Sequence, residues 1–151
     1  MSPDRLWLLS CRLHERGHTR AARVVKTIIF LLFHAVLPYE ARLGRDVQFW
    51  HRGLGVVVHP NSSIGDGARI SQNVTLASGD WEIADEPTVV IGRGVMIGAG
   101  AFISSRKGRV LRIGDGARIG ANAVVTDDVA AWTTVAGPKA TVISSRPAEF
   151  D

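Results

Sequence analysis

The chain has 151 residues, enough for one domain that buries about two-thirds of the surface that its unfolded form would expose. Its single cysteine, Cys11, has no internal disulfide partner and no stretch resembles a secretory signal, so we expect a cytoplasmic protein. The formal net charge of +4 indicates anionic partners, but the basic residues are dispersed and no nucleic-acid-binding motif occurs, so we expect no nucleic-acid partner.

Two amphipathic helices are predicted at the start of the chain. The first is predicted over residues 4–16, where three leucines recur at helical spacing on one face: Leu6, Leu9 and Leu13. The second is predicted over 19–36, because Pro38 cannot continue a helix. Its apolar face is expected to consist of Ala21, Val24, Val25, Ile28, Leu32 and Ala35.

The second helix has two candidate partners. We expect the helical pair to pack on the chain that follows and on a neighbouring subunit. The alternative is a peripheral membrane contact, because Arg20, Arg23 and Lys26 lie beside the apolar run 28–33. The longer apolar stretch, 27–37, is too short to span a bilayer.

An irregular turn is predicted at 51–55, where the sequence reads His-Arg-Gly-Leu-Gly between two apolar segments. Two glycines so close to a histidine indicate a turn that bends sharply or that lets another group approach its backbone. This segment is out of phase with the pattern that surrounds it.

A six-residue repeat fills residues 64–125. An aliphatic residue recurs at positions 64, 70 and 76, at 91, 97 and 103, and at 113, 119 and 125, usually followed by glycine. Six residues can form one short strand and one tight turn, with the aliphatic side chain pointing inward. Three such segments close a triangular coil, and stacked coils bury a continuous aliphatic column. The repeat therefore predicts an all-β solenoid; β-hairpins are the alternative, but they would not keep one phase so closely.

Two segments break the repeat. Residues 77–89 hold charged and aromatic side chains, which indicates a loop ejected from a coil, where functional residues concentrate. Residues 104–111 form a second, shorter break with a basic centre at 106–109, which is either a solvated turn or an anion contact.

The repeat phrases at 113–125 (IGDGARIGANAVV) and 94–101 (GVMIGAGA) resemble the hexapeptide-repeat acyltransferases, and residues 51–76 are similar to the serine O-acetyltransferase branch. The resemblance covers about residues 40–143. It implies a left-handed parallel β-helix at 40–143, preceded by the helical pair at 1–39 and followed by a tail at 144–151. Serine acetyltransferases carry a larger helical domain in front of the β-helix.

This resemblance implies an acetyl-CoA-dependent O-acetyltransferase that acts by direct transfer on a small hydroxyl acceptor, either serine or a sugar of a polysaccharide precursor. It also implies a homotrimer that binds acetyl-CoA, as a co-substrate, in the groove between subunits. Two alternatives remain: a β-helix scaffold that has lost catalysis, and a membrane-surface module of polysaccharide biosynthesis.

His51 is the expected catalytic residue. Histidine is the natural base for taking a proton from a hydroxyl near neutral pH. His51 matches the position of the catalytic histidine in serine acetyltransferases, whereas His59, which follows the Val-Val-Val run, is a weaker candidate. Neither histidine has cysteine or acidic neighbours at metal-ligand spacing, so we expect no metal site.

The acceptor site departs from the family pattern at two positions. Trp50 stands where those enzymes have an aspartate that orients the histidine, and Glu86 stands where they have a histidine that contacts serine. We expect Glu86 and Asp80 to contact the acceptor. The candidates for orienting the His51 ring are Asp46, Asp80 and Asp85.

The cofactor site is expected at small corner residues, which let the pantetheine arm reach backbone amides. These are Ser78, Gly98, Ala99, Ala117 and Ala121, although repeat geometry alone would also account for the glycine and the alanines. Arg118 and Lys139, and less directly Lys107, are expected to meet the nucleotide phosphates.

Overall fold

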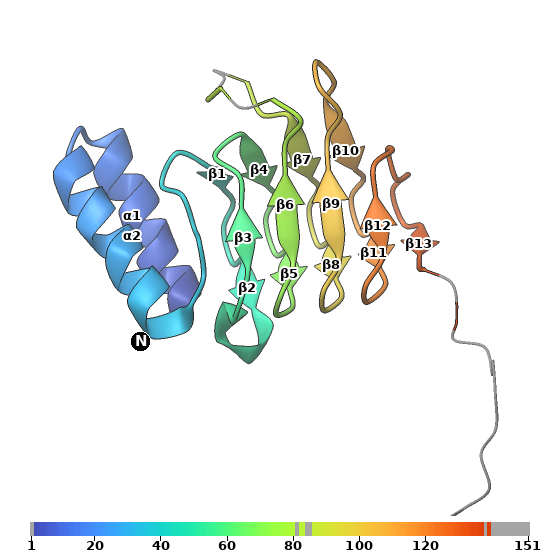
Figure 1. Ribbon diagram of the computed structural model, residues 1–151, viewed down its shortest axis with the longest axis horizontal. Coiled ribbons are helices and arrows are strands. Elements are labelled where there is room, and N and C mark those ends of the chain that lie inside the picture. Colours follow the sequence, from blue (N-terminus) through green and yellow to red (C-terminus); the bar gives the residue numbers. More distant parts are fainter. Residues whose placement is uncertain (1, 81, 84–85, 138, 140–151) are drawn as a thin grey trace, which may run out of the picture.

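The computed structural model describes residues 2–80, 82–83, 86–137 and 139, and it places two helices at one end of a stack of short parallel strands (Figure 1). The helices are α1 (Pro3–Glu15) and α2 (Thr19–Phe33), as the sequence predicted, although α2 ends three residues earlier than expected. Gly17 joins them with φ +81°, and His34 ends α2 in the left-handed conformation.

The buried face of α2 differs from the predicted one. The structure buries Ala22, Ile29 and Phe33, whereas most of the residues expected to face the core lie on the exposed side of the helix. α2 is apolar around most of its circumference, so periodicity alone could not choose the face. Packing against α1 makes the choice, because the Ser10 hydroxyl donates to the Ala22 carbonyl at 2.9 Å.

The strands form three parallel sheets. Up to β12 every third strand pairs, so three strands make one coil, and β13 pairs with β11 because the last coil meets sheet 1 only through the isolated bridge of Val129 to Ile113. Sheet 1 contains β1 (Arg42–Leu43), β4 (Ser62–Ile64), β7 (Val89–Ile91) and β10 (Leu111–Ile113). Sheet 2 contains β2 (Gln48–Phe49), β5 (Arg69–Ile70), β8 (Met96–Ile97), β11 (Arg118–Ile119) and β13 (Thr134–Val135). Sheet 3 contains β3 (Val57–Val58), β6 (Thr75–Ala77), β9 (Phe102–Ser104) and β12 (Val124–Val125).

The strand register confirms the six-residue repeat, because its aliphatic positions pair with one another from coil to coil. Sheet 1 aligns Leu43, Ile64, Ile91 and Ile113. Sheet 2 aligns Phe49, Ile70, Ile97, Ile119 and Val135. Sheet 3 aligns Val58, Leu76, Ile103 and Val125. These three columns share one core with Trp7 of α1 and Ile29 of α2, so the helices close the first coil.

Two edges of the coils carry the irregular segments. We call the turns between sheets 2 and 3 the histidine edge; they comprise residues 50–56, 71–74, 98–101 and 120–123. We call the turns between sheets 3 and 1 the loop edge; its described residues are 59–61, 78–80, 82–83, 86–88, 105–110 and 126–128. Both breaks in the repeat therefore leave the coils at the same edge, which is not the edge that carries His51.

Candidate active site

His51 lies in a strained turn. The turn (η1, Trp50–Gly53) links β2 to β3, and both His51 (φ +51°) and Arg52 (φ +59°) adopt the left-handed conformation. That conformation costs on the order of 1 kcal/mol or more for each residue that is not glycine. The turn is held by the Val56 N–H, which donates to the Gly53 carbonyl at 3.0 Å, so the strain is fixed in the fold and keeps His51 exposed.

The imidazole of His51 has no hydrogen-bond partner among the residues that the structure describes. Two of the proposed orienting carboxylates lie elsewhere, since Asp46 is between β1 and β2 and Asp80 is on the loop edge. The third, Asp85, lies outside the described residues. Within one chain, neither of the described carboxylates supplies the orienting contact that Trp50 cannot make.

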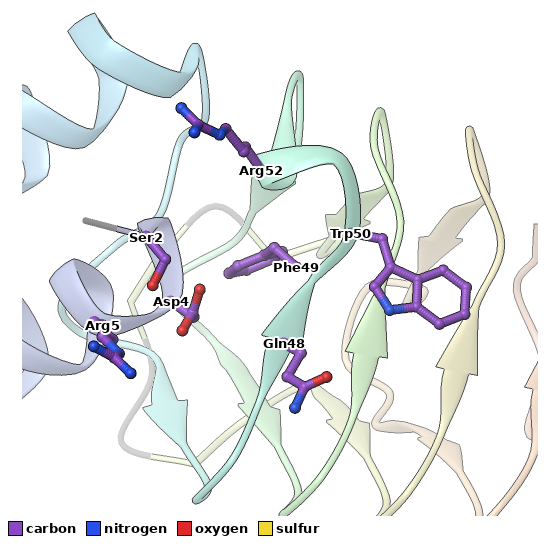
Figure 2. Close-up of a pocket in the computed structure, with 7 residues that line it drawn as sticks. All are labelled: Ser2, Asp4, Arg5, Gln48, Phe49, Trp50 and Arg52. Carbon is purple, nitrogen blue, oxygen red and sulfur yellow. The ribbon is translucent and has the colours of Figure 1, made fainter.

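A pocket of about 500 Å³ opens beside this turn, between the start of α1 and strand β2 (Figure 2). It is lined by Ser2, Asp4, Arg5, Gln48, Phe49, Trp50 and Arg52. Arg52 extends toward the helices, whereas the Trp50 indole extends to the other side of the turn (Figure 2). Sequence reasoning did not find this pocket, because only the packing of α1 on the first coil brings Asp4 and Arg5 to β2.

Ser78 and Asp80 join the two loops of the loop edge. The Ser78 hydroxyl accepts hydrogen bonds from the Thr88 hydroxyl at 2.9 Å and from the Asp80 N–H at 3.0 Å. The Asp80 carboxylate accepts from the Gly108 N–H at 3.1 Å, which connects the first loop to the second. Both side chains are therefore engaged in holding the loops together.

His59 also lies on the loop edge, where its ring is already used. Its Nδ1 accepts a hydrogen bond from the Asn61 N–H at 3.1 Å, which places the proton of the neutral ring on Nε2. Burial lowers the pKa of His59, and the Asp80 carboxylate offsets this only in part. A neutral ring with one nitrogen occupied and the other protonated is poorly suited to act as a base.

Glu86, the other expected acceptor contact, forms an exposed ion pair with Arg42 at 3.1 Å. Arg42 belongs to β1, so this pair joins the long loop to the first coil across sheet 1. Any acceptor that used Glu86 would share it with this arginine.

The expected cofactor residues are distributed over several parts of the molecule. Gly98, Ala99 and Ala121 come together on the histidine edge, where a Cβ on Gly98 would lie 2.6 Å from the Ala121 nitrogen. Arg118 lies exposed on the outer face of sheet 2, and Lys139 is exposed beyond β13. Ala117 is fully buried in the core, so its side chain is not available to a ligand.

Sheet 3 separates the two edges and carries exposed apolar side chains. Val57, Phe102 and Val124 point outward at paired positions on neighbouring strands, with Thr75 between the first two. We call this surface the sheet 3 face. Exposed apolar groups arranged in a row are typical of a surface that contacts another protein.

The described residues contain no group of three or more His, Cys, Asp or Glu side chains placed to bind a metal ion. Over the same part of the chain, none of the helices has the length and apolar character needed to cross a membrane.

No protein-family model matches the sequence. The chain is 34% identical over 137 residues to a serine acetyltransferase of Helicobacter pylori, a match that covers 90% of this chain and 76% of that enzyme. It is 38% identical over 132 residues to the serine acetyltransferase of Haemophilus influenzae, of which it spans 47%.

Solved structures give the same result. Serine acetyltransferase of Neisseria gonorrhoeae in complex with serine superposes with a TM-score of 0.76 at 31% identity, over 93% of this chain and 55% of that one. The Brucella abortus enzyme in complex with coenzyme A superposes with a TM-score of 0.78 at 29% identity, over 92% and 53%. The chain thus spans about half the length of these two structures. Taken with its repeat, its three parallel sheets and its identity to the Helicobacter enzyme, this shows that the chain belongs to the serine acetyltransferase family of hexapeptide-repeat acyltransferases.

Proposed function

We propose that this protein is an acetyl-CoA-dependent O-acetyltransferase whose acceptor is a small hydroxyl compound, with serine as the first candidate. The observation that carries the proposal is His51, held exposed in a strained turn on the edge of a serine acetyltransferase fold. Backbone strain of this kind is retained where it serves a site. The coils are proposed to wind in the left-handed sense of a hexapeptide β-helix, and the protein is proposed to act in the cytoplasm.

In the proposed reaction His51 takes the proton of the acceptor hydroxyl while the hydroxyl oxygen attacks the thioester carbonyl of acetyl-CoA. Backbone N–H groups at the glycine turns stabilise the resulting oxyanion. The C–S bond then breaks, the acetyl group stays on the acceptor oxygen, and the proton passes from His51 to the departing thiolate. Direct transfer uses no enzyme nucleophile, which agrees with the burial of Cys11.

The complete site is proposed to form between copies of the chain in a homotrimer. Within one chain, the sheet 3 face lies between the histidine edge and the loop edge. If this face is buried in a three-fold assembly, the histidine edge of one copy borders the loop edge of the next. That arrangement would bring His51 to Glu86 and Asp80 of a neighbouring copy and form the groove for the pantetheine arm.

A sugar hydroxyl is the second candidate acceptor. The pocket beside the His51 turn supports it, because it offers an aromatic ring, two guanidinium groups and a carboxylate to a larger polar ligand. Trp50 itself replaces a carboxylate that the serine-specific pattern would supply.

The proposal is tested by following thiol release from acetyl-CoA with a panel of serine, related amino alcohols and sugars, together with calorimetric titration of coenzyme A. Release that depends on one acceptor supports the proposal and identifies the acceptor class. Absence of coenzyme A binding would instead favour the non-catalytic scaffold.

A further inference from the structure

The outward side of α2 is an unpartnered apolar surface. Four large residues on it are exposed, which we call the outer stripe: Val24 (59%), Ile28 (39%), Leu31 (65%) and Leu32 (62%). They lie on the side of the helix away from the buried Ala22, Ile29 and Phe33. A helix that already buries one face on its own domain has no structural need for a second apolar face, so the outer stripe is suited to an external partner.

The net positive charge of the chain comes from the same helical pair, although basic residues occur throughout the sequence. Residues 1–39 contain six Lys and Arg against two Asp and Glu, which accounts for the whole formal net charge of +4. The other 112 residues are balanced, with twelve of each sign. α2 itself has no acidic residue, and Arg20 and Arg23 lie exposed next to the outer stripe. On α2 the apolar surface is therefore accompanied by cations and by no anion.

A pocket opens on the flank of α2 that carries Arg23 and Lys26, and none of its lining residues belongs to the outer stripe. It has a volume of about 340 Å³ and is lined by Arg23, Lys26, Thr27, Phe30, Ala35, Val36 and Tyr39. The Lys26 ammonium lies 5.4 Å from the centre of the Tyr39 ring. Two cations beside aromatic walls suit a phosphate group that carries an apolar chain.

We propose that α2 is a docking surface for an anionic lipid bilayer. The outer stripe inserts at the boundary between headgroups and acyl chains, while Arg20 and Arg23 contact lipid phosphates. α2 has 15 residues and is about 22 Å long, shorter than the ~30 Å hydrocarbon core, so it lies in the plane of the interface. The coils stack away from the helical end (Figure 1).

Charge decides between a bilayer and a second copy of the chain as the occupant. Two outer stripes packed together would leave Arg20 and Arg23 of both copies without a carboxylate from α2, because α2 has none. An anionic bilayer supplies both the apolar layer and the negative charge. The inference does not depend on the proposed acetyl transfer.

The test is co-sedimentation of the full chain with vesicles of neutral phosphatidylcholine and with vesicles that contain equal parts of phosphatidylcholine and phosphatidylglycerol. Wild type is expected to bind only the anionic vesicles. Two double variants, Arg20→Glu with Arg23→Glu and Leu31→Gln with Leu32→Gln, are expected to lose about tenfold or more in partitioning. The matched control is Arg69→Glu with Arg112→Glu, which makes the same charge change on the outer faces of sheets 2 and 1 and should retain binding.

Three results would overturn the proposal. Wild type could fail to bind anionic vesicles, or the control could lose as much binding as the Arg20 and Arg23 variant. The third result is that, without lipid, the Leu31→Gln, Leu32→Gln variant sediments as a smaller assembly than wild type. That would mean that the outer stripe packs against another copy of the chain. Circular dichroism on each variant checks that the helices remain folded.

Discussion

Asp66 and Asp115 connect successive coils at the level of single residues. The Arg45 N–H donates to Asp66, and the Arg93 N–H donates to Asp115, both at 2.8 Å, and each arginine side chain also pairs with the same carboxylate. The pKa of each carboxyl lies below its ordinary value of 3.8. The main cause is the hydrogen bond from the backbone N–H, and the second is the hydrogen bond from the guanidinium group.

These two carboxylates should make stability depend on pH in the acid range. Because their pKa values are lower in the folded state than in the unfolded state, their contribution is complete above pH 3.8 and is lost as the pH falls through the lower folded values. The double variant Asp66→Asn, Asp115→Asn should be less stable at pH 7 and show a flatter decline below pH 4 in urea unfolding. Asp46→Asn removes a nearby charge as a control; an equal effect there would contradict the assignment.

Cys11 should be chemically inert in the folded protein. The thiol is buried and lies 3.6 Å from the Ala41 carbonyl, and burial raises the pKa of Cys11 to about 12. At pH 8 we expect labelling by a thiol reagent to be at least about a hundredfold slower than in urea-unfolded protein, because the thiolate is the reactive form. Rapid labelling under native conditions would mean that α1 opens readily.

At the scale of elements, the coils were predictable and the helix orientation was not. An aliphatic residue every six positions specifies three inward columns. Each strand is so short that a single inward-pointing side chain fixes which side of the strand faces the core. The apolar residues of α2 occupy several faces, so the contact with α1 was needed to show that Ile29, and not Ile28, is buried.

The candidate site was likewise predictable only in part. The glycines around His51 indicated its irregular turn, since only a few residues tolerate such a backbone. The separation of Glu86 and Asp80 from His51 was not predictable, because it follows from which of the three edges each loop leaves. The pocket at Asp4 and Arg5 likewise depends on tertiary packing.

Gly55 should be essential to the geometry of the His51 turn. It has φ +68°, and a Cβ added there would overlap Asn73 Oδ1 of the next coil. Gly67 has nearly the same φ, +69°, but open space around it. Gly55→Ala should therefore cost more stability than Gly67→Ala, by about 1–3 kcal/mol in urea unfolding, and only Gly55→Ala should also reduce activity. Equal losses would indicate that backbone strain alone matters.

At the scale of the whole molecule, the proposed trimer depends on the sheet 3 face. A charge at Phe102 or Val124, both exposed on that face, would have to be buried in the assembly. In analytical ultracentrifugation we expect wild type to sediment as a trimer and the variant Phe102→Glu, Val124→Glu as a monomer, with loss of acetyl transfer. Met96→Glu on sheet 2 is the control; dissociation by that variant, or an active monomer, would argue against a site shared between copies.

The most direct test of the central claim compares His51→Ala with His59→Ala in the acceptor-dependent release of thiol from acetyl-CoA. If His51 is the general base, its loss should lower kcat/KM by about 10² or more without changing the unfolding midpoint. His59 already accepts a hydrogen bond from the Asn61 N–H, so its loss should affect kcat/KM much less. Retention of activity in His51→Ala, or an equal loss in His59→Ala, would contradict the proposed mechanism.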